Sequence, residues 1–274
     1  MSSAAGLEYP FIRSLFHSFT VATGLLAGLA SAFSAELATR PEPLKSGIEF
    51  ASAEVRALQQ DEFSSPAMLW VTRGEKLWNE PAGAGNKSCA SCHQDARTSM
   101  KGVSARYPQV DPGSARLINA EGRINQCRTQ NQQATALRYE SDELLALTAY
   151  VGHQSRGLPM NVAIDPQNRR NFEHGKSIFY TRIGQMNLAC AHCHERSWGR
   201  KLLAETISQA HGNAYPAYRL EWQTVGSLHR RLRACFFGVR AERPPAGSQD
   251  LLDLELFLAW RSQGLKIETP GVRR

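Results

Sequence analysis

The pattern C-x-x-C-H occurs twice in this chain of 274 residues, once from Cys89 to His93 and once from Cys190 to His194. In this pattern two thiols bind the vinyl groups of one porphyrin, and the adjacent histidine ligates the iron. A redox-active cysteine pair or a zinc site is the competing interpretation. Because both copies carry the histidine, we expect two covalently bound haem c groups. Their expected attachment residues are Cys89, Cys92 and His93, and then Cys190, Cys193 and His194.

The residues around the two motifs also repeat. A glycine lies at the same spacing before each motif, at Gly74 and at Gly175. The chain therefore contains two related units. The matching positions downstream, each displaced by 108 residues, are Tyr107-Pro108 and Tyr215-Pro216, and Arg123-x-x-x-Cys127 and Arg231-x-x-x-Cys235.

Each unit ends in a pattern that is typical of an amphipathic helix. The first pattern begins at Ser141 and stops at Gly157, and the second begins at Ser248 and stops at Gly264. A serine followed by acidic residues suits a helix N-terminus, and glycine suits its end. Apolar residues recur at i, i+3 and i+7, which predicts a buried stripe on each helix. The two stripes are Leu144, Leu147 and Val151, and Leu251, Leu254 and Leu258.

The order of these features predicts the fold. An early helix with a glycine, then C-x-x-C-H, then a loop-rich middle and a final helix is similar to class I cytochrome c, here twice over. No run of residues alternates convincingly enough to predict a strand. We therefore expect a mainly α protein of two tandem class I cytochrome c-like domains, residues 33–160 and 161–274.

The first residues have the features of a secretory signal peptide. The run from Phe19 to Ala32 carries no ionisable side chain and is too short to span a bilayer comfortably. It ends in a small-x-small pattern, Ala30-Ser31-Ala32, that suits a signal peptidase. We expect residues 1–32 to be removed, which leaves a periplasmic protein without a membrane span. An uncleaved membrane anchor is the alternative.

The net charge of +7 does not predict nucleic-acid binding. The arginines are scattered, no nucleic-acid-binding motif accompanies them, and the propionates of two haems would offset part of the charge. A basic face for an anionic substrate or an acidic partner is compatible with this composition.

The ligand on the far side of each iron needs a separate argument. An ordinary class I cytochrome uses a downstream methionine, but no methionine follows Met186 in the second unit. The potential ligand that both units share is a cysteine, Cys127 or Cys235. A disulfide between these two cysteines is the alternative in an oxidising compartment, although two separate haem pockets would hold them too far apart. The remaining candidates are Met100, His153 and Met160 in the first unit, and His211 and His229 in the second.

Several segments together resemble the SoxA family, the dihaem cytochrome subunit of the bacterial SoxAX complex that starts thiosulfate oxidation. The likeness covers nearly all of the expected mature chain and includes the flanks of both shared cysteines. The segments are Gln60-Asp61-Glu62-Phe63 with Pro66 and Leu69-Trp70-Val71, then Ile124-Asn125-Gln126-Cys127-Arg128, Arg231-Leu232-Arg233-Ala234-Cys235 and Gly238-Val239-Arg240, and the tail from Ile267 to Arg274.

The resemblance implies an activity and its partners. Such an enzyme, an L-cysteine S-thiosulfotransferase, joins thiosulfate to a cysteine of the carrier protein SoxYZ and releases two electrons toward a cytochrome c acceptor. It works as a heterodimer with SoxX, a small monohaem cytochrome. A thiosulfate dehydrogenase that forms tetrathionate and a plain electron-transfer dihaem cytochrome are the alternative functions.

The resemblance also implies a role for individual residues. The iron ligands would be His93 and Cys127 at the first haem, and His194 and Cys235 at the second, catalytic haem. Thiosulfate is a dianion that must approach a thiolate, so fixed positive charge has to offset the repulsion. The family places one arginine four residues before the catalytic cysteine and another on the last helix. Arg231 and Arg261 stand at these positions. Arg231 is the first choice, with Arg261 and Arg240 as weaker candidates.

Overall fold

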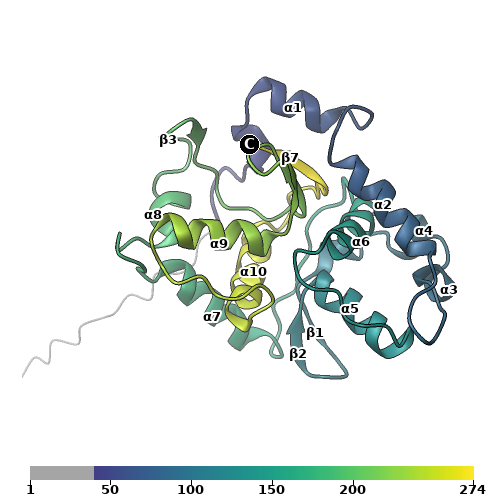
Figure 1. Ribbon diagram of the computed structural model, residues 1–274. Helices are drawn as coiled ribbons and strands as arrows, with labels where there is room; N and C mark the ends of the chain where they lie inside the picture. Colours follow the sequence, from purple (N-terminus) through teal and green to yellow (C-terminus); the bar gives the residue numbers. More distant parts are fainter. Residues whose placement is uncertain (1–39) are drawn as a thin grey trace, which may run out of the picture. The chain divides into compact units, whose positions relative to one another are not determined.

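The structure is a computed structural model that describes residues 40–274. The predicted signal peptide, residues 1–32, lies outside the described residues. Residues 40–274 are rich in helices and contain small sheets of two or three strands (Figure 1). The prediction of a mainly helical chain is confirmed, and the small sheets are an addition to it. No helix in the described range is long and apolar enough to cross a membrane.

Part of the order of elements in residues 40–160, the first half, recurs in residues 161–274, the second half: a helix, the short C-x-x-C-H helix, a two-stranded hairpin and two further helices. The first half contains η1 (Gly47–Phe50), α1 (Ala53–Gln60), α2 (Met68–Asn79), α3 (Cys89–His93), α4 (Ala96–Ser99), η2 (Ser104–Arg106), β1 (Gln109–Asp111), β2 (Arg116–Ile118), α5 (Ala120–Asn131) and α6 (Asp142–His153). The second half contains α7 (Arg169–Tyr180), α8 (Cys190–His194), β3 (Lys201–Leu202), β4 (Glu205–Thr206), β5 (Ala217–Arg219), β6 (Thr224–Gly226), α9 (Leu228–Gly238), α10 (Gln249–Arg261) and β7 (Gly271–Arg273).

The short strands are the feature that the sequence pattern does not predict. Strands β1 and β2 pair antiparallel with Asp111 opposite Arg116, and β5 and β6 pair in the same register with Arg219 opposite Thr224. The final strand β7 adds to β5 in parallel. Strands of two or three residues are too short to form an alternating apolar pattern. The sequence therefore contained no signal that could predict them.

Two helix pairs pack closely at the repeated glycines. Helix α2 crosses α6 at Gly74, where a Cβ atom would lie 2.1 Å from the carbonyl oxygen of Ala146. Helix α7 crosses α10 at Gly175, where a Cβ would lie 1.9 Å from the carbonyl oxygen of Asp253. No side chain fits at these distances, so each glycine lets two helix backbones approach directly. These crossings fix the helix that leads into each C-x-x-C-H motif.

The predicted apolar stripes of the two final helices are buried, as expected. Helix α6 begins after Ser141, whose hydroxyl accepts a hydrogen bond from the amide of Leu144. The core around α10 also takes in Ala105, Leu117 and Met160 from the first half. Residues 38–274 accordingly form one compact unit, and the division into domains at residue 160 stays a prediction.

The segment before α2 holds the C-terminal tail. Helix α1 lies beside β7 (Figure 1). The side chain of Gln59 accepts a hydrogen bond of 3.0 Å from the amide of Val272, and Arg273 donates to Glu268 at 2.6 Å. The first described segments are thereby held against the last strand, β7, which is part of the sheet that contains β5.

Candidate haem sites

Both C-x-x-C-H motifs form one short helix, α3 in the first half and α8 in the second. At the first motif, the hydroxyl of Ser88 accepts a hydrogen bond of 3.0 Å from the amide of Ser91 and so caps α3. The ring of Trp78 on α2 lies 5.7 Å from the His93 ring, and its Nε1 donates to the carbonyl of Gln94 at 3.0 Å. The thiols of both motifs are free. Their arrangement is therefore open to thioether bonds with a haem.

His194 is held in one orientation by the backbone. Its Nδ1 donates a hydrogen bond of 2.7 Å to the carbonyl oxygen of Ser208. Because a carbonyl only accepts, Nδ1 carries the proton and Nε2 is the nitrogen left to act as a ligand. The same ring forms a hydrogen bond with the sulfur of Cys235. A histidine nitrogen and a cysteine sulfur thus face one point beside α8, which is a donor set that fits a haem iron.

Cys127 is half-buried and lies close enough to the first motif for its charge to act on Cys89. Burial raises the pKa of Cys127, Arg123 opposes the rise, and Cys92 adds to it. Cys235 lies correspondingly beside Cys190, the first cysteine of the second motif. Each downstream cysteine is therefore next to the motif of its own half, and the six cysteines, all described, form no disulfide.

The two downstream cysteines differ in their charge environment. Burial opposes ionisation of Cys235, but the charge of Arg231, the hydrogen bond with His194 and the charge of Arg219 outweigh it and lower the pKa of Cys235 to about 7. At neutral pH this sulfur is consequently ionised far more readily than an ordinary buried thiol. The thiolate in turn raises the pKa of Arg231. The second half therefore contains a sulfur whose anionic form is stabilised by nearby cations.

The equivalent arginine of the first half is neutralised instead. Arg123 forms a salt bridge of 2.9 Å with Asp111 and donates to the Tyr107 hydroxyl at 3.1 Å. Hydrogen bonds from Ser114 and Gln126, and then from Arg123, hold the pKa of Asp111 well below its usual range. In the described range no carboxylate lies within salt-bridge distance of Arg231. The positive charge of Arg231 is therefore available to an anion, and that of Arg123 is not.

Other residues proposed for the site lie further from Cys235. Arg261 is fully buried under α10, with its guanidinium 4.7 Å from the centroid of the Phe179 ring and 3.8 Å from Glu195. Its charge acts on His211, which adjoins His194. Arg240 is exposed beyond the end of α9. The structure thus brings the charge of Arg231 to the sulfur, buries Arg261 at the end of α10, and leaves Arg240 at the surface.

Two histidine candidates for the second iron are occupied elsewhere. His211 has both ring nitrogens in hydrogen bonds, to Ser262 at 3.0 Å and to Gln209 at 3.1 Å. His229 lies 2.9 Å from Glu255 and accepts from the amide of Gly247. Two candidate ligands for the first iron also have other contacts. Met160 lies in the apolar core, and His153 lies 3.7 Å from Glu62.

Comparison with known proteins identifies the family. Residues 73–160 match the family model described as the SoxA/TsdA cytochrome c domain. The chain is 44% identical over 230 residues to the L-cysteine S-thiosulfotransferase subunit SoxA of Pseudaminobacter salicylatoxidans, covering 84% of this chain and 80% of that relative. The chain belongs to the SoxA family. It is also 38% identical to the subunit of the same name from Paracoccus pantotrophus, over 86% of this chain and 81% of the relative.

A solved structure supports the same assignment. The crystal structure of SoxXA from P. pantotrophus matches with a TM-score of 0.82 at 38% identity, covering 84% of this chain and 87% of the other. As a SoxA family member with a cytochrome c domain, the chain carries covalently bound haem c.

One residue near Cys235 was not among the residues predicted from the sequence of this SoxA family member. Arg219 at the end of β5 is 4% exposed, and its charge acts on Cys235. The signal that would have found it is the internal repeat, because Arg219 is displaced by the same 108 residues from Asp111.

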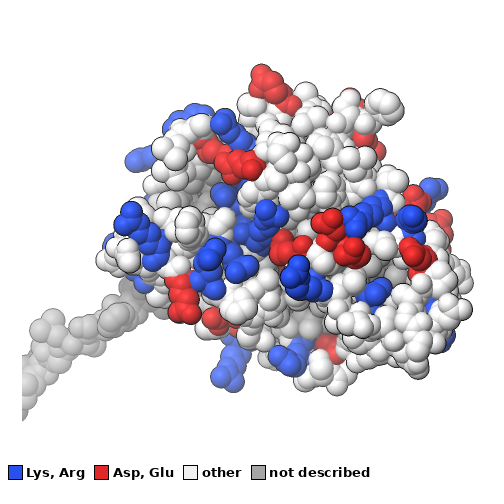
Figure 2. Space-filling model, in the orientation of Figure 1, with Lys and Arg blue, Asp and Glu red and all other residues white. Residues whose placement is uncertain are grey.

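On the surface, Lys and Arg side chains gather over the face that carries α8 and α9 (Figure 2).

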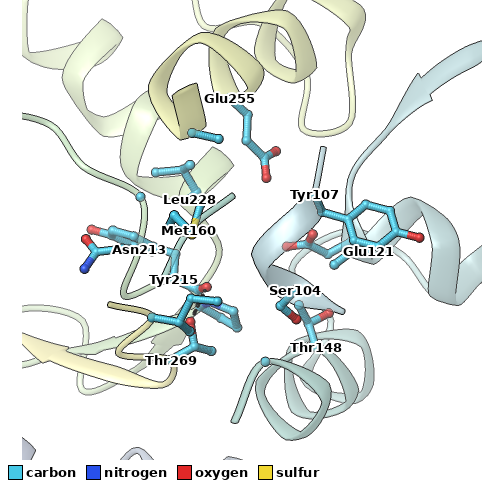
Figure 3. Close-up of a pocket in the computed structure, with 16 residues that line it drawn as sticks. Ser104, Tyr107, Glu121, Thr148, Met160, Asn213, Tyr215, Leu228, Glu255 and Thr269 are labelled. Atoms are coloured by element: carbon cyan, nitrogen blue, oxygen red, sulfur yellow. Dashed lines mark hydrogen bonds between the residues drawn. The ribbon is translucent and has the colours of Figure 1, made fainter. Parts of the chain in front are cut away.

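A small cavity of about 70 Å³ lies between the two halves. Glu121 on α5 and Glu255 on α10 project into it from opposite elements (Figure 3). Burial and the nearby Glu255 raise the pKa of Glu121 to about 7, although His229 opposes the shift. None of the motif cysteines lines this cavity, so it is separate from both haem sites.

Proposed function

We propose that this chain is the SoxA subunit of a periplasmic SoxAX-type enzyme, an L-cysteine S-thiosulfotransferase. The enzyme couples thiosulfate to a cysteine of a SoxYZ-like carrier protein. The observation that carries the proposal is the environment of Cys235, where His194, Arg231 and Arg219 favour an ionised sulfur. The name of the relatives from P. salicylatoxidans and P. pantotrophus supports the same activity.

The chain binds two haems in this proposal, in two tandem class I cytochrome c-like domains. The haem at the second site supplies an electron acceptor next to the reacting sulfur. The first haem is held by Cys89, Cys92, His93 and Cys127, and the second by Cys190, Cys193, His194 and Cys235. The fit of a nitrogen and a sulfur donor at one point beside α8 supports this ligand set.

The overall reaction consumes the carrier thiol and thiosulfate. A sulfur–sulfur bond forms between the carrier cysteine and the terminal sulfur of thiosulfate, the thiol loses its proton, and two electrons leave. The product is a cysteine S-thiosulfonate, which carries one negative charge where thiosulfate carried two. A cytochrome acceptor takes the electrons, so atoms and charge balance without another reactant.

The residues of the chain bring two anions together. Cys235 offers a thiolate, and Arg231 offsets the repulsion between this thiolate and the incoming dianion. The planar guanidinium matches two oxygens of the sulfonate end, which orients the terminal sulfur. Arg261 takes part as a buried positive charge that acts through His211, which adjoins His194.

The proposed partners follow from the family. A SoxX-like monohaem cytochrome forms a heterodimer with this chain, since the matching structure from P. pantotrophus is that of SoxXA. A SoxYZ-like carrier supplies the acceptor cysteine, and a cytochrome c takes the electrons. The signal-like residues 1–32 support a periplasmic location, where haem attachment and export coincide.

The decisive experiment compares wild type with Cys235→Ala in the complete heterodimer. Both proteins are first checked by intact mass, which reads the leader cleavage and the number of haems together. We expect two haems in each protein and loss of thiosulfate-dependent electron release in the variant. Carrier coupling by the variant at the wild-type rate contradicts the proposal. Tetrathionate formed by wild type without the carrier instead identifies a thiosulfate dehydrogenase, and haem reduction independent of thiosulfate identifies a plain electron-transfer cytochrome.

A further inference from the structure

The two halves share one backbone framework around their downstream cysteines. The hairpin β1–β2 and the hairpin β5–β6 have the same pairing register, displaced by 108 residues. The following helices, α5 and α9, begin at positions with that same displacement. The last residue of β1 therefore lies in the same place relative to Cys127 as the last residue of β5 does relative to Cys235.

The charge at this shared position is reversed between the halves. In the first half the position holds Asp111, which is 3% exposed and binds Arg123 at 2.9 Å, one helical turn before Cys127. In the second half the position holds Arg219, which is 4% exposed. The pocket of Cys127 thus contains a neutralised ion pair, whereas that of Cys235 contains two arginines, Arg219 and Arg231.

Trp222 and Glu221 hold the guanidinium of Arg219, and Glu221 is too exposed to neutralise its charge fully. The guanidinium lies 5.1 Å from the centroid of the Trp222 ring, and its Nη2 lies 3.2 Å from Glu221. The Glu221 side chain is 50% exposed, so this ion pair is screened by solvent and weak. The Nε of Arg219 is buried and has no hydrogen-bond partner among the described residues. A buried donor without a partner is costly unless a ligand supplies an acceptor.

We propose that Arg219 is a second anion-binding residue of the Cys235 site, which acts together with Arg231 to hold the sulfonate end of thiosulfate. This inference rests on the proposed function for the identity of the anion. Two guanidinium groups match the two charges of the substrate, and their planar forks donate hydrogen bonds to several of its oxygens at once. The reversal of charge from Asp111 to Arg219 makes the second pocket selective for a dianion, and the first pocket lacks this selectivity.

The first test measures anion binding without turnover. Sulfate, an unreactive dianion of similar shape, is titrated calorimetrically into the complete heterodimer of wild type and of Arg219→Gln. We expect about tenfold weaker sulfate binding in the variant, in line with the loss of one charged hydrogen-bond donor. Thiosulfate turnover should show a similar rise in KM with kcat changed far less, because the residue holds the unreacting end of the substrate. Haem spectra and thermal unfolding verify that the variant is folded.

Arg230→Gln is the matched control. Arg230 lies over the same Trp222 ring at 4.3 Å, but it is not one of the groups with the largest effects on the pKa of Cys235. Sulfate binding by this variant should equal that of wild type. Unchanged sulfate binding in Arg219→Gln, or an equal loss in both variants, overturns the proposal.

A second variant leaves Arg219 in place and is expected to change sulfate binding in the opposite direction. Glu221→Gln frees Arg219 from its carboxylate, so sulfate binding should tighten by a factor of about two to five, as expected for loss of an exposed ion pair. Weaker or unchanged binding in Glu221→Gln contradicts the proposal even if Arg219→Gln fails to fold. If wild type does not turn over thiosulfate but Arg219→Gln still loses sulfate binding, the proposed function fails and the anion site remains.

Discussion

Arg123 and Asp111 form a salt bridge of 2.9 Å in the first half of the chain. The counterpart of Arg123 in the second half is Arg231, which faces Cys235 without such a partner in the described range. The two haem sites therefore share a framework and differ in charge. This difference supports the proposal that Cys235 takes part in catalysis whereas Cys127 serves only its own haem.

Replacing Arg231 should weaken catalysis strongly. Arg231→Ala should lower thiosulfate turnover by a factor on the order of a hundred or more, because one preorganised charge near the reacting anion is lost. Arg231→Lys should restore only part of the rate, since a point charge does not reproduce the planar two-pronged contact. Steady-state kinetics with the carrier measure both effects. Full activity of Arg231→Ala, at normal haem content, would show that another group offsets the repulsion.

Replacing Cys127 by methionine should raise the potential of the first haem. A thiolate stabilises ferric iron, whereas methionine with histidine raises the potential. We expect an upward shift on the order of 100 mV or more, within the range that axial ligands span. Spectroscopic redox titration and spin resonance of the ferric protein measure the change, with the second haem as the internal control. An unchanged potential would exclude Cys127 as a ligand.

Glu121→Gln should make the stability less dependent on pH. The folded pKa of Glu121, about 7, lies above its unfolded value of 4.5 because of burial and the charges of Glu255 and Glu140, with His229 opposing. The favourable contribution of the protonated acid is complete below pH 4.5 and is lost as pH rises through 7.

The variant should therefore equal wild type near pH 4.5 and exceed it at pH 8 by on the order of 2 kcal/mol. Denaturant unfolding of the haem-loaded proteins at both pH values measures this difference. A difference that is the same at both values of pH, or a variant less stable at pH 8, would contradict the role given to Glu121.

Gly175→Ala should destabilise the second half. The new methyl group would lie 1.9 Å from the carbonyl oxygen of Asp253, so α7 and α10 must move apart, at a cost of about 1–3 kcal/mol for an overpacked contact. Ser177→Ala on the exposed face of α7 is the control and should leave the unfolding midpoint nearly unchanged. Equal midpoints for Gly175→Ala and wild type would mean that the two helices are not in close contact at this crossing.

The local pattern of the sequence determines several features of this protein. The covalent haem chemistry follows from C-x-x-C-H, because thiol spacing and the adjacent histidine are properties of neighbouring residues. Helices α6 and α10, which end a few residues before Gly157 and Gly264, and their buried stripes also follow from spacing along the chain. The same spacing shows that Cys127 and Cys235 are equivalent positions. The Arg-x-x-x-Cys repeat pointed to Arg231 for the same reason.

The charge environment of each cysteine was decided only by the tertiary structure. Asp111 neutralises Arg123, and Arg219 reaches the neighbourhood of Cys235, because hairpins of three-residue strands turn these side chains onto the following helices. Strands this short leave no periodic signal. The field at a buried sulfur depends on distance and burial through space, and a residue on another element, Arg219, contributes to it beside Arg231.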